Sequence, residues 1–373
     1  MTTRHVDVAV IGGGLVGAAI AFGLRALGPR LVVIDEGDVA WRASRGNFGL
    51  IWVQGKGQGL PAYGAWTQRS ARAWPQLAAA LRECTGIDVA LRQDGGLHVC
   101  LSRPELDARA AKMSALLAQP GFECYAIEVL DRAGVAARLP GVGRDVVGGT
   151  WSDLDGDCNP LRLLRALHAA IAAAGSEIVT GDGIDVIEPR AAGFVLRSSR
   201  GILECETLVL AAGLGNARLA PMVGLVAPVV PNKGHVIVTE RVAPFLPIPL
   251  ETIRQTDDGT VMIGDSQQSR GFDDNLELPV LAALADRAAR VFPQLRGVRV
   301  NRTWAALRVM SPDGFPVYAQ SVRHPGAFLA TCHSGVTLAA AHAYHLAPAI
   351  AAQTLPSEFL PFAADRFDVR AAA

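Results

Sequence analysis

The chain has 373 residues, which is long enough for two hydrophobic cores. Its composition, 50% hydrophobic and 19% charged residues, is typical of a globular protein and argues against disorder. Lysine plus arginine and aspartate plus glutamate both number 35, and this net charge of zero leaves no electrostatic case for binding nucleic acid or an acidic membrane. The six cysteines show no CxxC or metal-ligand spacing, so we expect no metal site in this chain.

The chain also lacks the marks of a membrane or secreted protein. No window reaches the roughly 18 to 20 uninterrupted apolar residues that a membrane span needs. Its start runs straight into an apolar segment, without the basic region, apolar core and cleavage site of a secretory signal. We therefore expect a cytoplasmic protein with no membrane span and no nucleic-acid partner.

The first forty residues predict a dinucleotide-binding unit. Residues 8–11 and 31–34 are short apolar runs typical of buried strands, and a glycine-rich turn and a helical pattern separate them. Gly12 permits the tight turn, Gly14 lets a pyrophosphate approach the backbone, and Gly17 lets the helix pack closely on the strand.

The start of this helix and the acids after the second strand complete the pattern. The free N–H groups of the first helical residues, Leu15 and Val16, and the helix dipole favour a phosphate. Asp35 stands at the end of the second strand and is the preferred partner of the adenosine ribose, with Glu36 as the alternative. Strand, turn, helix, strand and acid in this order predict a bound dinucleotide.

A second glycine-rich stretch follows at residues 41–59. Its glycines, small polar residues and arginines suit a loop that wraps a cofactor, and Phe48 and Trp52 disfavour the alternative of a fully exposed loop. A helix is then predicted over residues 66–82, where Pro75 should kink or restart it. Asn159 and Gly175 have the residue types of a helix N-cap and a helix C-terminal glycine.

The other elements alternate along the rest of the chain. Further helices are predicted over residues 105–117, 131–139, 160–175, 279–292 and 338–352. Strands are predicted over residues 95–101, 177–196, 208–213, 226–240, 260–264, 298–307 and 328–331. The buried strand at 208–213 again runs into a glycine. Because it lies nearly two hundred residues after the first turn, the nucleotide domain must be assembled from separated segments.

Several stretches resemble the FAD-dependent amine and amino-acid oxidoreductases of the D-amino-acid oxidase (DAO) superfamily. They are residues 1–40, 208–213, 304–317 (WAALRVMSPDGFPV) and 330–339. Within the superfamily, RASRGNFG at 42–49 and PNKGH at 231–235 look most like two groups. One is the FAD subunit of hydrogen cyanide synthase, and the other is the FAD-containing β subunits of opine oxidases and D-hydroxyproline dehydrogenases.

This resemblance implies an α/β fold of the glycine and sarcosine oxidase kind. A Rossmann-type FAD-binding domain would comprise residues 1–85, 145–225 and 325–373. A β-sheet-rich α+β substrate domain would comprise residues 86–144 and 226–324.

The resemblance also implies which residues hold FAD. The turn from Gly12 to Gly17 and Asp35 would hold the ADP half. The other implied residues are Arg42, Ala43, Ser44, Gly46, Asn47, Phe48 and Gly49 along the pyrophosphate, ribityl chain and flavin, Val186 near the adenine, Ala212 and Gly213 under the cofactor, and Gly335, Val336 and Thr337 by the flavin pyrimidine. A helix N-terminus at the last three would stabilise the negative charge of the reduced ring. No histidine lies in residues 42–49, where sarcosine-oxidase relatives attach FAD, so non-covalent FAD is expected.

Arg308 and His333 are the predicted catalytic residues. The resemblance pairs the arginine of the W-x-x-L-R segment, Arg308, with the substrate carboxylate, which a guanidinium can grip with two parallel hydrogen bonds. The alternative is a structural arginine in an internal ion pair. His333 matches the histidine of the family's G-H motif, but a packed, hydrogen-bonded histidine is an equal alternative. Lys233 and His235 are weaker candidates.

The predicted reaction removes a hydride from the carbon that bears the amine of an amino acid, such as an opine or D-hydroxyproline, and water hydrolyses the resulting imine. The resemblance implies a catalytic β subunit beside a larger subunit with an iron–sulfur cluster. It leaves open an FMN between the subunits, and the loop at residues 55–59 is expected to face either that FMN or the partner subunit. The alternatives are a self-sufficient glycine, sarcosine or D-amino-acid oxidase that uses oxygen, and a non-catalytic flavin electron-relay subunit.

Overall fold

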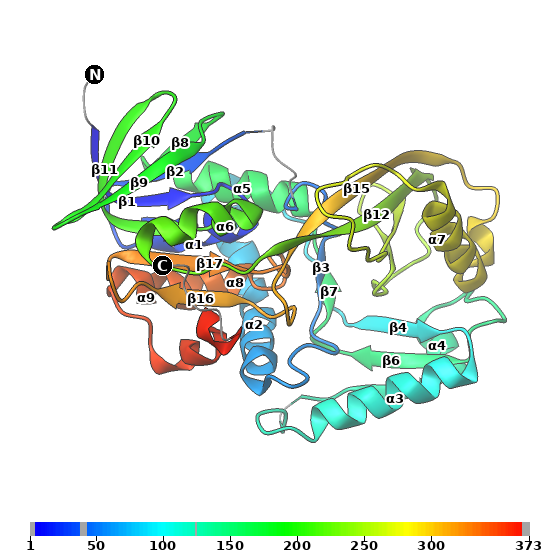
Figure 1. Ribbon diagram of the computed structural model, residues 1–373. Helices are drawn as coiled ribbons and strands as arrows, with labels where there is room; N and C mark the ends of the chain where they lie inside the picture. The colour runs from blue at the N-terminus through cyan, green and yellow to red at the C-terminus, as the bar shows by residue number, and fades with distance from the viewer. Residues whose placement is uncertain (1–3, 38–42, 124, 368–373) are drawn as a thin grey trace.

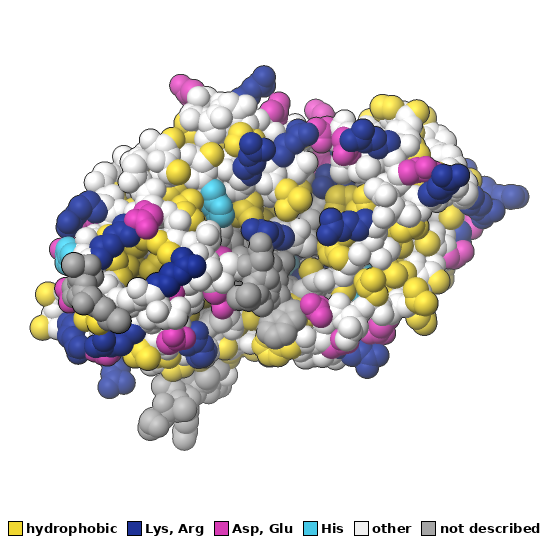
Figure 2. Space-filling view, turned by 90° about the horizontal axis from the view of Figure 1, so that it is seen from above, with side chains coloured by type: hydrophobic (Ala, Val, Ile, Leu, Met, Phe, Trp, Pro, Cys, Tyr) yellow, Lys and Arg dark blue, Asp and Glu magenta, His cyan; other side chains and the backbone are white. Residues whose placement is uncertain are grey.

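A computed structural model of the chain describes residues 4–37, 43–123 and 125–367. Two parts lie side by side in Figure 1. One part contains an eight-stranded sheet with its helices, and the other contains a four-stranded and a three-stranded sheet. Basic and acidic side chains both occur across the face shown in Figure 2.

The eight-stranded sheet has a parallel centre. β1 (Arg4–Ile11) pairs in parallel with β2 (Leu31–Asp35) on one side and β11 (Gly201–Leu210) on the other. Parallel pairs continue outward to β8 (Glu177–Thr180) and β17 (Ala327–Thr331). The central strands are apolar and mostly buried because both faces of the sheet are covered. Their carboxyl ends meet at one edge, where ligands of open α/β sheets bind.

Helices cover one face of this sheet, and an antiparallel extension flanks it. The covering helices are α1 (Leu15–Arg25), α2 (Pro61–Thr85) and α5 (Pro160–Ala173), with the succession α8 (Ala339–Ala341), π-helix η4 (His342–Leu346) and α9 (Ala347–Ala351). The extension consists of β9 (Ile184–Arg190), β10 (Gly193–Ser198) and, at the far edge, β16 (Val317–Gln320). Among the described residues, no helix combines the length and apolar character that crossing a bilayer requires.

Two predicted helix details have different outcomes. Asn159 caps α5 by accepting a hydrogen bond from the Arg162 N–H at 3.1 Å, as predicted. Of the predicted kink or restart at Pro75, the restart is wrong, because α2 runs unbroken from Pro61 to Thr85, and the kink stays a prediction. Proline removes the N–H that would bond the carbonyl four residues earlier. That carbonyl, on Ala71, instead accepts a hydrogen bond from Gln93 Nε2 at 2.8 Å.

The second part is built from antiparallel strands. Its larger sheet has the order β13 (Ile253–Gln255), β14 (Thr260–Ile263), β12 (Val230–Arg241), β15 (Val300–Met310). Its smaller sheet has the order β4 (Gly96–Cys100), β6 (Gly148–Ser152), β5 (Glu128–Asp131). The helices α3 (Arg103–Leu117), α4 (Arg132–Arg138) and α7 (Leu278–Val291) accompany these sheets, and one apolar core joins both.

A two-stranded ribbon of β3 (Leu50–Ile51) and β7 (Gly156–Asp157) lies between the two parts (Figure 1). Two strands belong to the other part than the predicted boundaries imply: β6 was placed in the FAD-binding domain, and β16 in the substrate domain. β6 pairs with β4 and β5, and β16 pairs with β17 in the large sheet. The division into two discontinuous domains stays a prediction in its details.

Candidate active site

A cavity of about 460 Å³ opens at the carboxyl ends of the central strands β1, β2 and β11. It is lined by most of the residues predicted to hold a dinucleotide. These are Gly12, Gly14, Leu15, Val16, Asp35, Glu36, Ala43, Ser44, Asn47, Ala212, Gly213 and Gly335. Segments almost two hundred residues apart therefore form one cavity because their strands are neighbours in the sheet.

Close backbone packing shapes this cavity. Gly12 has a φ of +105°, and a Cβ there would lie 2.4 Å from the Ala211 carbonyl oxygen, so only glycine fits. The Asp35 carboxylate accepts a hydrogen bond from the Gly13 N–H at 2.7 Å. Ser44 Oγ accepts one from the Leu15 N–H at 2.9 Å, which ties the second glycine-rich loop to the start of α1.

Some predicted cofactor residues lie away from the cavity wall. Gly17 serves the close packing expected of it, since a Cβ there would lie 2.0 Å from the Gly12 carbonyl oxygen. Gly49 packs instead against the Cys158 carbonyl. Val186 is 42% exposed, and Ile184, two residues earlier, lines the cavity instead. Arg42 falls outside the described residues.

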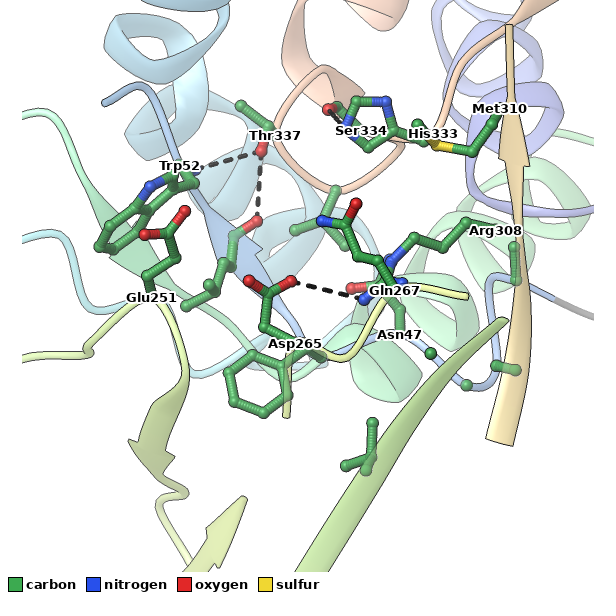
Figure 3. A pocket seen from close by; sticks show the side chains of 18 of the residues that line it. Asn47, Trp52, Glu251, Asp265, Gln267, Arg308, Met310, His333, Ser334 and Thr337 are labelled. Carbon is green, nitrogen blue, oxygen red and sulfur yellow. Dashed lines mark hydrogen bonds and ion pairs between the residues drawn. The ribbon is translucent and has the colours of Figure 1, made fainter. Parts of the chain in front are cut away.

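A second cavity of about 240 Å³ adjoins the first. Ala43, Asn47 and His333 line both, so the two cavities meet at these residues. The predicted residues Gly46, Phe48, Val336, Thr337 and Arg308 line the smaller cavity. Figure 3 shows Arg308 reaching in from β15, with His333 and Ser334 across the cavity. We call these spaces the cofactor cavity and the substrate cavity.

Arg308 is half-buried and already has protein partners. Its Nη1 donates to the Ser266 carbonyl at 2.8 Å and to Asn232 Oδ1 at 3.2 Å, and its Nη2 lies 3.5 Å from Asp265 Oδ1. Burial raises the pKa of Asp265, although the Arg308 charge opposes this. Arg308 thus lines a cavity, as a substrate-binding residue would, and also takes part in an internal ion pair, which was the alternative.

A second acid, the half-buried Glu251, faces the substrate cavity (Figure 3). It is paired with His98 Nδ1 on β4. Burial raises the pKa of Glu251, but the hydrogen bond and charge of His98, together with Arg109 and Lys56, outweigh burial and bring it to about 2. Glu251 is therefore a fixed negative charge at one end of the cavity.

His333 lies in a hydrogen-bonded group that includes Lys56. The Lys56 ammonium is 3.0 Å from His333 Nε2 and donates to Ser334 Oγ at 3.1 Å. Tyr63 OH lies 2.9 Å from the same Ser334 oxygen. Burial lowers the pKa of His333 well below its usual value, and the charges of Lys56 and Arg308 lower it further. His333 is therefore neutral, and its Nε2 can accept from Lys56.

The helix predicted beside residues 335–337 begins at α8, with Leu338 as its N-cap. Thr337 Oγ1 accepts a hydrogen bond from the Trp52 N–H at 3.1 Å and donates to the Leu50 carbonyl at 3.2 Å. These bonds hold the turn before α8 against β3, at the wall of the substrate cavity.

Lys233 and His235, the weaker candidates, do not line either cavity. Lys233 is fully buried, and its Nζ lies 2.8 Å from carboxylate oxygens of both Asp273 and Glu277. His235 Nε2 accepts from the Glu277 N–H at 3.2 Å. Both residues thus anchor the segment after β14, whose residues Asp265 and Gln267 line the substrate cavity.

The model of the DAO family, described as FAD dependent oxidoreductase, matches residues 7–349. The chain belongs to this family. The family match confirms the predicted resemblance to the DAO superfamily and makes the chain an FAD-dependent oxidoreductase.

Two relatives of this DAO-family protein are subunits by name. It is 44% identical over 368 residues to an opine oxidase subunit of Agrobacterium tumefaciens (strain Ach5), covering 99% of both chains. It is 28% identical over 413 residues to the hydrogen cyanide synthase subunit HcnC of Pseudomonas aeruginosa, covering 99% of this chain and 98% of that one.

A solved structure confirms the predicted fold class. The glycine oxidase from Geobacillus kaustophilus superposes with a TM-score of 0.87 at 25% identity, covering 97% of this DAO-family chain and 98% of that chain. The α/β fold with a nucleotide-binding sheet and a second, β-rich part is shared.

Three charged residues that line the substrate cavity of this chain were not among the predicted site residues: Lys56, Glu251 and Asp265. Lys56 stands in the Gly55–Gly59 loop that was expected to face an FMN or a partner. In the structure Lys56 turns into the cavity, whereas Gln58 and Gly59 are exposed. Glu251 and Asp265 follow no motif, and only the tertiary fold brings them to the cavity.

Proposed function

We propose that the chain binds FAD without a covalent bond in the cofactor cavity, with the adenosine ribose at Asp35 and the pyrophosphate at the start of α1. The cavity fits this group because Gly12, Gly13 and Gly14 keep side chains out of it. A Cβ on Gly14, for example, would lie 2.8 Å from Ser44 Oγ. The N-terminus of the eleven-residue helix α1 favours an anion there.

The proposed reaction oxidises the C–N bond of an amino acid, with a secondary amine such as an opine or D-hydroxyproline as the preferred substrate. Bound FAD supplies the two-electron acceptor for the hydride that leaves the α-carbon. Arg308 binds the substrate carboxylate and so orients the α-carbon toward the junction of the two cavities. The observation that carries this proposal is that Arg308 and His333 line a cavity that meets the cofactor cavity.

The surroundings of the proposed site favour a neutral amine, which hydride loss requires. The substrate cavity is lined in part by apolar side chains such as the buried Trp52 and the half-buried Met310, and burial disfavours a charged amine. Neutral His333 adds no positive charge beyond those of Arg308 and Lys56. These two cations favour the deprotonated amine, whereas the negative charge of Glu251 opposes them, so burial is the main effect. Water then hydrolyses the released imine.

We further propose that the chain is the catalytic β subunit of a heteromeric dehydrogenase, whose larger partner carries an iron–sulfur cluster. The 44% identity to an opine oxidase subunit over 99% of both chains supports a subunit role. The similarity to a hydrogen cyanide synthase subunit points the same way. An FMN between the subunits is not needed for this proposal.

Anaerobic bleaching of the flavin tests the proposed function. The purified FAD-loaded chain is mixed without oxygen with amino acids, opines and hydroxyprolines, and air is then admitted. Bleaching by a secondary amino acid with slow reoxidation is expected. Fast reoxidation with peroxide would make the chain a self-sufficient oxidase. Bleaching by none of these compounds would contradict amino-acid oxidation and favour an electron-relay subunit.

A further inference from the structure

Lys56 is held in the substrate cavity by a loop built for that position. Gly55 and Gly57, on either side of it, have φ values of +80° and +87°. A Cβ on Gly57 would lie 2.3 Å from the Gly64 nitrogen, so the loop presses directly on α2. Before the loop, Asp155 accepts hydrogen bonds from the Val53 N–H and from Gln54 Nε2, the latter at 2.6 Å. The backbone on both sides of Lys56 is therefore fixed.

The contacts of the Lys56 ammonium are with neutral groups. Its two hydrogen-bond partners are neutral His333 and the Ser334 hydroxyl. Within the described ranges, no carboxylate oxygen lies within 4.0 Å of its Nζ. An ammonium has three N–H donors, so one donor is left for a ligand.

The two acids of the same cavity already have cationic or histidine partners. Asp265 is paired with Arg308, and Glu251 with His98. Lys56 thus brings a positive charge to the cavity without a matching negative charge of its own. A half-buried cation of this kind favours an anionic group of the ligand.

We propose that Lys56 is a second anion-binding residue of the substrate cavity and selects amino acids whose amine nitrogen carries a second, carboxylate-bearing arm. Arg308 would bind one carboxylate and Lys56 the other. This inference deepens the proposed function and rests on it, because Lys56 can select a substrate only if this cavity binds the substrate. It favours N-carboxyalkyl amino acids over hydroxyproline, which has one carboxylate. A charge that served the flavin instead would affect substrates of both kinds equally.

Binding of two unreactive ligands tests this assignment directly. Thiodiacetate and (methylthio)acetate lack an amine, and they differ by one carboxylate. Their dissociation constants for the FAD-loaded protein follow from changes in the flavin absorption spectrum. We expect the wild type to bind thiodiacetate about 10- to 100-fold more tightly, as a charge-assisted hydrogen bond allows.

Three variants separate the charge of Lys56 from other effects. Lys56→Met should bind both ligands with similar affinity, and Lys56→Arg should keep most of the preference for thiodiacetate. Lys112→Met removes an exposed lysine of α3 and should leave the preference unchanged. An undiminished preference in Lys56→Met would overturn the assignment. So would a wild type that binds both ligands equally.

Bleaching by iminodiacetate and sarcosine, which also differ by one carboxylate, distinguishes this inference from the proposed function. In Lys56→Met, the rate of flavin bleaching by iminodiacetate should fall about tenfold or more, and the rate with sarcosine should stay unchanged. Parallel losses with both amines would overturn the selective role and assign Lys56 to the flavin. If neither amine nor any other amino acid bleaches the wild type, the proposed function fails, and the ligand titration alone decides whether Lys56 binds the second carboxylate.

Discussion

The cofactor cavity and the substrate cavity meet at Ala43, Asn47 and His333, but they are built in different ways. The cofactor cavity is shaped by glycines, strand ends and the start of a helix. The substrate cavity is shaped by charged side chains that come from separate segments, among them Lys56, Glu251, Asp265 and Arg308.

This difference has a physical consequence for substitutions. Backbone contacts such as that between Gly12 and the Ala211 carbonyl leave no room for any added atom. The charged side chains of the substrate cavity can change identity while the backbone stays in place. We therefore expect changes in the first cavity to affect cofactor content, and changes in the second to affect substrate choice.

The largest effect is expected for Gly12→Ala. The added Cβ would lie 2.4 Å from the Ala211 carbonyl oxygen and would strain a φ of +105°. We expect FAD content to fall below about a tenth of the wild-type value, measured by the flavin-to-protein absorbance ratio after purification. Gly28→Ala is the matched control, because Gly28 has a φ of +86° but no atom within 4 Å of the added Cβ. Full FAD content in Gly12→Ala would contradict the close-packing argument.

The next largest effect, on stability, is expected at the β3–β7 ribbon between the two parts of the molecule. Asp157, 1% exposed, pairs with Arg92 Nη2 at 2.7 Å and with Arg254 Nη1 at 3.2 Å. Arg254 also donates to the Phe48 carbonyl, beside the substrate cavity. Asp157→Asn leaves buried positive charge unpaired, so the free energy of unfolding should fall by about 3 to 5 kcal/mol in urea titrations.

The control for this change is Asp7→Asn. Asp7 pairs with Arg30 on the surface, where ion pairs contribute less than about 1 kcal/mol. Equal, small losses in both variants would show that the Asp157 network does not hold the two parts together.

A smaller effect is expected in the acid pH dependence of stability, which Glu251→Gln should weaken. The pKa of Glu251 is lowered to about 2 in the folded protein from an ordinary value of 4.5, so its carboxylate stabilises the fold above pH 4.5. That contribution is lost as the pH falls from 4.5 toward 2. Between pH 5 and 3 the wild type should lose about 2 kcal/mol more unfolding free energy than Glu251→Gln. Identical losses in urea titrations at the two pH values would contradict the low pKa.

The contrast between the cavities also explains what could be predicted from the sequence. The glycine turn and Asp35 form a local pattern whose geometry follows from adjacent elements, and both line the cofactor cavity. Val186 was expected near the adenine, but Ile184 lines the cavity, and the pairing of β9 with β10 shifts register between these two residues, an irregularity that the sequence pattern does not indicate. The helix restart at Pro75 was wrong because the compensating partner, Gln93, follows after the end of α2.

The substrate cavity was harder to predict. Arg308 could be proposed because it stands in a recognisable segment. Lys56, Glu251 and Asp265 come together only through the tertiary fold, and Asp265 has a φ of +80°, which no local pattern indicates. Long-range pairing of this kind leaves no periodic signal in the sequence.

The most direct test of separate cofactor and substrate cavities is anaerobic flavin reduction by an amino acid in Arg308→Ala. We expect this variant to keep its full FAD content and its reduction by dithionite, because Arg308 does not line the cofactor cavity. Its reduction by the best amino-acid substrate should slow about 100-fold or more, since losing a carboxylate anchor removes both binding and orientation. Undiminished reduction by the amino acid would contradict the role of Arg308, and loss of FAD would contradict the separation of the two cavities.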